Sequence, residues 1–400
     1  MRGPQRLRSR AIVSTRPSRG WAIVAALSVT EIVSWGVLYY AFAVFLVPMQ
    51  RDLGYSAAEL TGAFSVSLLV AGVAGIAVGR FLDRHSPRAL MTAGSVAGPL
   101  LVLAWSRVES LGAFYAIWVA IGLVMATVLY EPAFTVLAKW FADERERKRA
   151  LTALTLVAGI SSFIFLPVGQ ALIDAHGWRD ALVILAVVLA AVTVPLHAAV
   201  LRRPPAAGAR RAEAGAAPGA GAVLRSSEFW ALAAAFFLGS VAAFAMIVQA
   251  IPFLLERGHG TGFAAFAVGL MGASQIPGRL VFGVAAVRLP GVFALIAIGI
   301  AVIVSVDGTA AVLAGMVVLG MGSGMAILAR ATVLADRYGP AEYGAIAGVM
   351  AAVTTAARAA GPIAAAAWAS VVGYEALLWT LVALGVLATG LALRRDATSP

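Results

Sequence analysis

Five ionisable side chains interrupt otherwise apolar stretches of the sequence, and they are the first candidates for chemistry. They are two acids, Glu31 and Glu131, and three arginines, Arg279, Arg330 and Arg358. A charge at the centre of a bilayer costs about 2.5–3.5 kcal/mol on insertion scales, so it normally faces a cavity, a partner or a substrate. Both acids lie in the first half of the chain and all three arginines in the second. The pattern predicts a polar cavity between two halves, with a positive side that could hold an anion.

Each of these residues suggests a particular role. Arg279 and Arg358 are candidates for binding a carboxylate, because a guanidinium can donate two parallel hydrogen bonds. Arg279 falls late in its apolar stretch and could instead extend to the membrane surface. Glu31 falls about ten residues into the first stretch, near mid-membrane at about 1.5 Å per residue, where it could carry a proton or form a fixed salt bridge or hydrogen bond. Glu131 and Arg330 fall at comparable levels of their helices and are predicted to form a gate.

The elements that must position these residues are membrane-spanning helices. The chain has 400 residues, of which 61% are hydrophobic and 12% charged, and about 20 apolar residues cross the hydrocarbon layer of a bilayer. The sequence predicts an all-α membrane protein with twelve transmembrane helices in two six-helix repeats. The expected helices span 21–48, 57–81, 89–106, 111–138, 149–173, 179–200, 228–254, 262–287, 291–306, 309–335, 342–370 and 372–393.

Polar segments divide the chain into five parts. We expect a cytoplasmic tail at 1–20, an N-terminal half at 21–200, a cytoplasmic linker at 201–227, a C-terminal half at 228–393 and a cytoplasmic tail at 394–400. The linker is rich in Ala, Gly, Pro and Arg and cannot build a core, so we expect it to be irregular. The apolar run after the first tail is longer than the core of a cleavable signal, and we interpret it as the first helix.

The distribution of basic residues predicts the orientation. A formal charge of +11 could indicate nucleic acid or an anionic membrane surface as a partner. The 30 lysines and arginines lie mostly in loops on one side of the predicted helices, however, which favours orientation as the explanation and argues against nucleic acid. We therefore expect a multi-pass protein of a bacterial-type plasma (inner) membrane with both termini cytoplasmic. Four arginines fall in the outer loops: Arg51, Arg107, Arg179 and Arg257.

The loop after the second predicted helix carries a recognisable motif. Residues 79–88 read Gly-Arg-Phe-Leu-Asp-Arg-His-Ser-Pro-Arg and resemble the helix 2–3 loop signature of the major facilitator superfamily, with Ser86 where glycine is usual. Gly79 would let two helices approach closely, and Asp83 could face the positive N-terminus of a neighbouring helix. Basic residues such as Arg84 could pair with acids across the cytoplasmic seam. Asp83 and Arg84 are therefore predicted to belong to the gate.

Other segments resemble one branch of this superfamily, which contains monocarboxylate transporters and oxalate/formate antiporters. In that branch a helix-8 arginine is associated with the substrate carboxylate, and Arg279 matches it. Oxalate/formate antiporters add a basic residue on helix 11, which Arg358 could supply. Monocarboxylate transporters carry an acid where this chain has Gln275 and a lysine where it has Tyr40, which argues against lactate-type proton coupling. The segments are Trp140-Phe141 with the charged run 143–149, His176-Gly177-Trp178-Arg179, and Gly278-Arg279 followed by Gly283.

The resemblance implies a secondary transporter of a small organic anion, a mono- or dicarboxylate, which works by alternating access with proton symport or anion exchange. Its predicted substrate site contains Arg279, Arg358, Tyr40 and Gln275, and Glu31 is the candidate for proton coupling. We expect a monomer that needs no cofactor or metal. The alternatives are an exporter of amphipathic or drug-like compounds, a membrane enzyme and a sensor. The enzyme class lacks a nucleophile–base set, since cysteine is absent and the four histidines are expected at helix ends.

Overall fold

The computed structural model describes residues 19–202, 219–285 and 287–396, and every regular element within them is a helix. The expected tail at 1–20 and the irregular linker at 201–227 fall largely outside these residues. The short helix α10 (Ala220–Val223) occupies the described end of the linker. The N-terminal half contains α1 (Arg19–Trp35), the π-helix η1 (Gly36–Tyr40), α2 (Ala41–Leu53), α3 (Ala57–Arg84), α4 (Pro87–Ser106), α5 (Leu111–Val128), α6 (Tyr130–Trp140), α7 (Glu144–Ala158) and α8 (Ser161–Val200). The C-terminal half contains α11 (Ser227–Glu256), α12 (Thr261–Val284), α13 (Leu289–Ser305), α14 (Thr309–Tyr338), α15 (Tyr343–Val372) and α16 (Tyr374–Asp396).

These helices form twelve membrane crossings, as the hydrophobic pattern predicts. Among the described residues, ten helical segments are long and apolar enough to span a bilayer. One of them, Glu144–Val200, contains two crossings, because the backbone of Gly177 leaves the helical region (φ 76°, ψ 163°) and α8 turns back there. Glycine adopts this positive φ without the steric cost that other residues meet. The shorter apolar helix α13 supplies the twelfth crossing.

The fourth crossing is broken where the sequence predicts one continuous helix, 111–138. Leu129 separates α5 from α6 with an extended backbone (φ −88°, ψ −163°). Pro132 lies three residues later and cannot donate a backbone hydrogen bond, and its ring would clash with the carbonyl of residue 128 in a continuous helix. The break places Tyr130 and Glu131 in the first turn of α6, at the inner surface of the N-terminal half.

The charged run 143–149, most of which falls between two expected helices, forms the N-cap and the first turns of α7. Asp143 caps α7, because its carboxylate accepts a hydrogen bond from the backbone N–H of Glu146 at 2.9 Å. Glu144 and Glu146 follow in the first turn, where acids interact favourably with the helix dipole. The fifth crossing therefore begins about five residues before the expected position 149 and presents several charges along one helix end.

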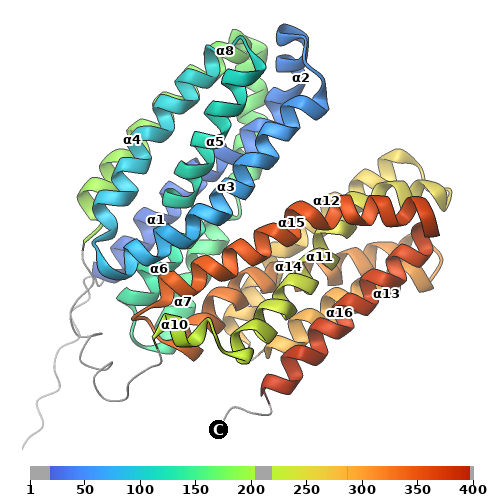
Figure 1. Ribbon diagram of the computed structural model, residues 1–400. Coiled ribbons are helices and arrows are strands. Elements are labelled where there is room, and N and C mark those ends of the chain that lie inside the picture. Colours follow the sequence, from blue (N-terminus) through green and yellow to red (C-terminus); the bar gives the residue numbers. More distant parts are fainter. Residues whose placement is uncertain (1–18, 203–218, 286, 397–400) are drawn as a thin grey trace, which may run out of the picture.

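The two halves pack together at one end of the molecule, which we call the closed end and define by α6, α7 and the first turn of α15. One buried apolar cluster there joins both halves and includes Leu137 and Ile346. A second cluster includes Trp105 and Trp118 and is drawn, among the described residues, from the N-terminal half. Figure 1 shows the blue-to-green half and the yellow-to-red half meeting near α6, α7 and α10 and diverging toward the opposite end.

Glycines allow α3 and α15 to cross closely at the closed end. A Cβ atom on Gly79 would lie 1.9 Å from the carbonyl oxygen of Gly344, and one on Gly348 would lie 2.6 Å from the carbonyl oxygen of Gly75. Both distances are far below van der Waals contact, so larger residues cannot occupy these positions without separating the helices. Close approach through small residues is typical of helix packing in membranes, where dispersion replaces the hydrophobic effect.

Candidate functional site

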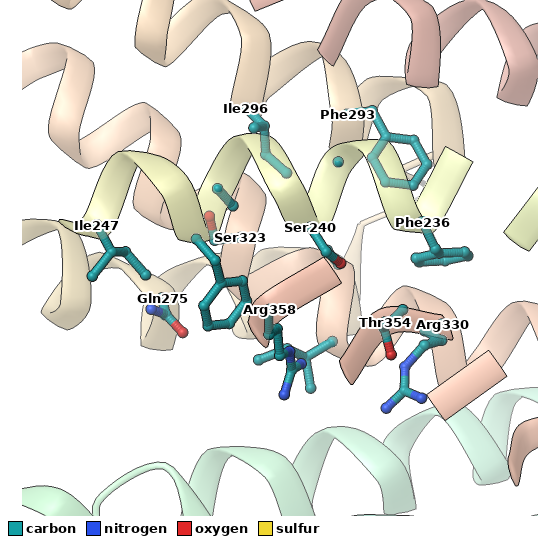
Figure 2. A pocket seen from close by; sticks show the side chains of 15 residues that line it. Phe236, Ser240, Ile247, Gln275, Phe293, Ile296, Ser323, Arg330, Thr354 and Arg358 are labelled. Carbon is teal, nitrogen blue, oxygen red and sulfur yellow. The ribbon is translucent and has the colours of Figure 1, made fainter. Parts of the chain in front are cut away.

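A pocket with a cationic edge and an apolar interior lies in the C-terminal half. Its lining comes from α11, α12, α13, α14 and α15. Figure 2 shows Arg330 and Arg358 side by side, with their guanidinium groups pointing the same way, toward the ribbon of the N-terminal half. The other polar side chains that line the pocket are Ser240, Gln275, Ser323 and Thr354.

Arg358 has no acidic partner within 4 Å among the described residues. Its guanidinium lies over the ring of Phe244, 4.8 Å from the centroid, and its buried Nε has no hydrogen-bond partner. A cation over an aromatic face is stabilised by about 0.5–2 kcal/mol, which offsets only part of the cost of placing the charge at this depth. The side chain therefore retains donors for an incoming anion.

Gln275 lines this pocket with Arg358, whereas Arg279 lies outside it. Arg279 is only 7% exposed and crosses between the halves, where its Nη1 donates a hydrogen bond to the carbonyl oxygen of Thr155 at 2.8 Å. Gly159 makes room for this contact, since a Cβ there would lie 2.6 Å from Nη1. Nε of Arg279 has no partner among the described residues. A substrate role for both arginines stays a prediction.

Tyr40 belongs to a group of aromatic residues on the facing surface of the N-terminal half. The ring of Trp35 lies 5.1 Å from Tyr39, 6.2 Å from Tyr40 and 4.9 Å from Tyr130, measured between centroids. Tyr39 and Tyr40 lie on η1, and π-helical turns within α-helices are frequent at functional sites. Arg279 and Arg358 both lie close enough to act electrostatically on Tyr40. The structure thus brings Tyr40 near both arginines.

Glu31 lies four residues before the C-terminal end of α1 and is fully buried. Neither of its carboxylate oxygens has a hydrogen-bond partner among the described residues. The groups that act on it most strongly are the indole of Trp35 and the carboxylate of Glu131. An unpaired buried carboxylate costs far more free energy than a neutral carboxyl group, so this position favours binding of a proton.

Glu131 and Arg330 form an ion pair between α6 and α14, at 2.5 Å between Oε1 and Nη2. The side chain of Glu131 is 25% exposed and that of Arg330 is 7% exposed. Nη1 of Arg330 is buried and has no partner among the described residues. Because Arg330 also lines the pocket, the same guanidinium belongs to the pocket and to the closed end.

Asp83 joins α3 to the other half through the N-terminus of α15. Its carboxylate accepts hydrogen bonds from the backbone N–H groups of Gly344 at 2.9 Å and Ala345 at 2.7 Å, as expected for an acid at a helix N-terminus. It also pairs with Lys139 at 2.8 Å. The side chain of Arg84 is exposed and makes no hydrogen bond or ion pair within the described part of the chain. The gate role of Asp83 and Arg84 stays a prediction.

Sequence reasoning missed several contacts that close this end. Arg147 on α7 pairs with Asp336 on α14 and also donates to the carbonyl oxygen of Phe141. Lys148 lies over the ring of Phe282 at 4.7 Å and donates to the carbonyl oxygen of Ala285 at 3.2 Å. The sequence signal for these contacts is the charged run 143–149, most of which falls between the expected helices 111–138 and 149–173.

His197 lies in the last turn of α8, at a helix end as expected, but its side chain is fully buried. Its Nδ1 lies 2.6 Å from the hydroxyl of Ser95 and its Nε2 lies 3.0 Å from the hydroxyl of Thr30. Thr30 donates its own proton to the carbonyl oxygen of Leu27, so Nε2–H is the donor to Thr30 and Nδ1 accepts from Ser95. This network links α1, α4 and α8. Among the described residues, no three His, Asp or Glu side chains are placed to hold a metal ion.

Twelve crossings in two halves, with buried charges where the halves face each other, define a membrane transport protein. The model of the Major Facilitator Superfamily matches residues 27–306, and the chain belongs to this family. It is therefore a transporter of that superfamily, as the motif at 79–88 predicts.

The chain is also similar to curated carboxylate transporters. It is 24% identical over 236 residues to the oxalate:formate antiporter of Oxalobacter formigenes, a match that covers 58% of this chain and 55% of that protein. It is 28% identical over 281 residues to monocarboxylate transporter 13 of Bos taurus, covering 68% of this chain and 62% of that one. The matched parts thus span little more than half the length of these relatives.

Two solved structures share the fold. The human organic anion transporter MFSD10 aligns with a TM-score of 0.71 and 16% identity, over 94% of this chain and 100% of its own. The transporter FucP in the outward conformation aligns with a TM-score of 0.73 and 15% identity, over 94% of this chain and 99% of its own. At these identities the likeness establishes the arrangement of helices.

Proposed function

We propose that the chain transports a small organic anion, a carboxylate, by alternating access of its two halves. The observation that carries this proposal is Arg358, a guanidinium at a pocket edge that has an unpartnered donor and, among the described residues, no acidic group within 4 Å. A buried, unpaired guanidinium costs free energy in an apolar bundle unless an anion binds to it and pairs with its charge. The curated relatives named above act on carboxylates, which supports the same conclusion.

Glu31 is the candidate for coupling transport to protons. Its carboxyl group is fully buried, has no hydrogen-bond donor among the described residues, and lies on the helix that continues into Tyr39 and Tyr40. A site of this kind holds a proton while it is enclosed and can release it when a change of conformation admits water. Coupled exchange of two anions is the alternative mode.

The orientation belongs to the same proposal. The closed end carries Arg84, Lys139, Arg147 and Lys148, and an excess of basic residues is typical of the cytoplasmic side. With this assignment the molecule faces outward, lies in a bacterial-type plasma (inner) membrane and has both termini in the cytoplasm. A single chain forms the transport unit.

Uptake into proteoliposomes tests the proposal. The purified full-length chain is reconstituted and offered a panel of labelled mono- and dicarboxylates, with and without an inward pH gradient. Arg358→Gln removes the charged donors, each worth about 1.5–3 kcal/mol, so uptake should fall at least tenfold. Arg51→Gln changes an exposed arginine on α2 and is the matched control. Wild-type rates in Arg358→Gln, or no uptake of any carboxylate by the native chain, would overturn the proposal.

The alternative, an exporter of amphipathic or drug-like compounds, fits the site less well where the compound is a cation. Arg330 and Arg358 give the pocket edge a positive charge that would repel a cationic compound. Uncharged amphipathic compounds belong in the same uptake panel as a comparison.

A further inference from the structure

The charges around the pocket favour a monoanion. Arg330 and Arg358 lie close enough to act on each other electrostatically, and Glu131 also acts on Arg358. The ion pair with Glu131 neutralises Arg330, which leaves one positive charge in excess at Arg358. One carboxylate would balance this charge. A second carboxylate would lie beyond it, among the residues that line the interior.

The interior of the pocket is mainly apolar and includes the rings of Phe236, Phe244 and Phe293. Phe236 and Phe293 are 2% and 1% exposed, and their rings meet edge to face at 5.2 Å between centroids. Gly239 lets Phe293 approach α11, since a Cβ there would lie 2.6 Å from the ring. Figure 2 shows Phe236 and Phe293 set back from the two guanidinium groups. Rings in this arrangement can receive a further flat ring by stacking or edge contact.

The hydroxyl groups of the lining are mostly engaged by their own helices. Ser323 donates to the carbonyl oxygen of Leu319 at 2.8 Å, and Thr354 donates to that of Met350 at 3.1 Å. Among the described lining residues, the Ser240 hydroxyl and the Gln275 amide are the uncharged donors left for a polar substrate, whether a sugar or a second carboxylate. A polar group buried there without a partner would be disfavoured.

We infer that the preferred substrate is a monocarboxylate with an apolar, planar tail, such as an aryl-substituted acid, and that small dicarboxylates are poor substrates. This inference rests on the proposed function and names its substrate class. The carboxylate binds at Arg358, beside Arg330, and the tail enters the space lined by Phe236, Phe244 and Phe293.

Three probes separate the two features of the substrate. Acetate carries the carboxylate alone, phenylacetate adds the ring, and phenylmalonate adds a second carboxylate to the ring. Their affinities for the purified full-length protein are measured from ligand-dependent thermal stabilisation in detergent. Phenylacetate should bind at least tenfold more tightly than acetate, and phenylmalonate at least tenfold more weakly than phenylacetate.

A substitution that fills the pocket tests the location. Ser240→Leu places a bulky side chain on the pocket side of α11 and should reduce the preference for phenylacetate over acetate to less than threefold. Val248→Leu, on the same helix at a position 51% exposed, should keep the wild-type preference. If Ser240→Leu does not fold, the affinities of the wild-type protein for the three probes still test the predicted substrate class. Equal affinity for acetate and phenylacetate, or tighter binding of phenylmalonate, would overturn the inference while leaving carboxylate transport intact. No binding of any carboxylate would instead refute the proposed function.

Discussion

Replacing Gly79 with alanine should open the closed end of the molecule. An ideal Cβ at this position would lie 1.9 Å from the carbonyl oxygen of Gly344, whereas ordinary contact begins at 3.4 Å. The backbones of α3 and α15 must therefore separate locally by about 1.5 Å, the difference between these two distances. Backbone atoms cannot turn aside as a flexible side chain would, so the strain falls on the packing of the two halves.

The same separation would break the contacts of Asp83. Its hydrogen bonds to the N–H groups of Gly344 and Ala345 are 2.9 and 2.7 Å long, and adding about 1.5 Å takes both beyond hydrogen-bonding range. A hydrogen bond to a charged group contributes about 1.5–3 kcal/mol. Loss of one such bond shifts an equilibrium at least tenfold, since 1.4 kcal/mol corresponds to a factor of ten. The penalty arises only when this end is closed, so the alternative state gains population.

Alkylation of a single introduced cysteine measures the shift. The chain has no native cysteine, and Ala347 on α15 is 1% exposed, so a thiol in Ala347→Cys should react slowly with a maleimide. The rate should rise at least tenfold when Gly79→Ala is added. Gly75→Ala is the matched control, one turn earlier on α3, because a Cβ there meets nothing within 4 Å. Equal rates in Gly79→Ala and Gly75→Ala would refute the reasoning.

Further predictions are tested by alkylation of Ala347→Cys or by uptake into proteoliposomes. Glu131→Gln or Arg330→Gln should speed alkylation of Ala347→Cys severalfold, since a partly hydrated ion pair contributes on the order of 1 kcal/mol. The charge-swapped double variant should return the alkylation rate part of the way to that of the Ala347→Cys protein. Unchanged rates in the single variants would exclude a gate formed by this pair. Glu31→Gln should abolish accumulation driven by a pH gradient while exchange of substrate persists, and intact accumulation would reduce Glu31 to a structural role. A saturating carboxylate should accelerate alkylation in the Ala347→Cys protein severalfold, whereas no change would separate the pocket from the gate.

The helices could be predicted from the sequence because each crossing depends on local apolar composition. The membrane imposes a minimum length on each apolar helix, and the polar turns of this chain are short and distinct. The twelve crossings could therefore be predicted without knowledge of contacts between helices. The exceptions have local causes that can be found afterwards. Pro132 breaks the fourth crossing, and Asp143 starts α7 earlier than the hydrophobic pattern alone indicates.

The candidate site depends on contacts between residues far apart in the sequence, which hydrophobicity does not determine. Arg279 and Arg358 look alike as buried arginines in apolar helices. They differ because the carbonyl oxygen of Thr155 meets one, whereas the ring of Phe244 lies under the other. Likewise His197 is near the end of an apolar run, and only the packing of α1 and α4 shows that it is enclosed.

Arg330 connects the pocket to the closed end in the proposed cycle. Nη2 of Arg330 is held by Glu131, while Nη1 has no hydrogen-bond partner within the described part of the chain. A carboxylate at Arg358 can therefore approach Arg330 before the ion pair breaks. When the halves rock apart at this end, Glu131 recedes and the anion remains as a partner of Arg330. Without an anion the same movement would leave two adjacent guanidinium groups unpaired in an apolar bundle, which is costly. The arrangement therefore favours the conformational change when substrate is bound, which is the requirement for tightly coupled exchange.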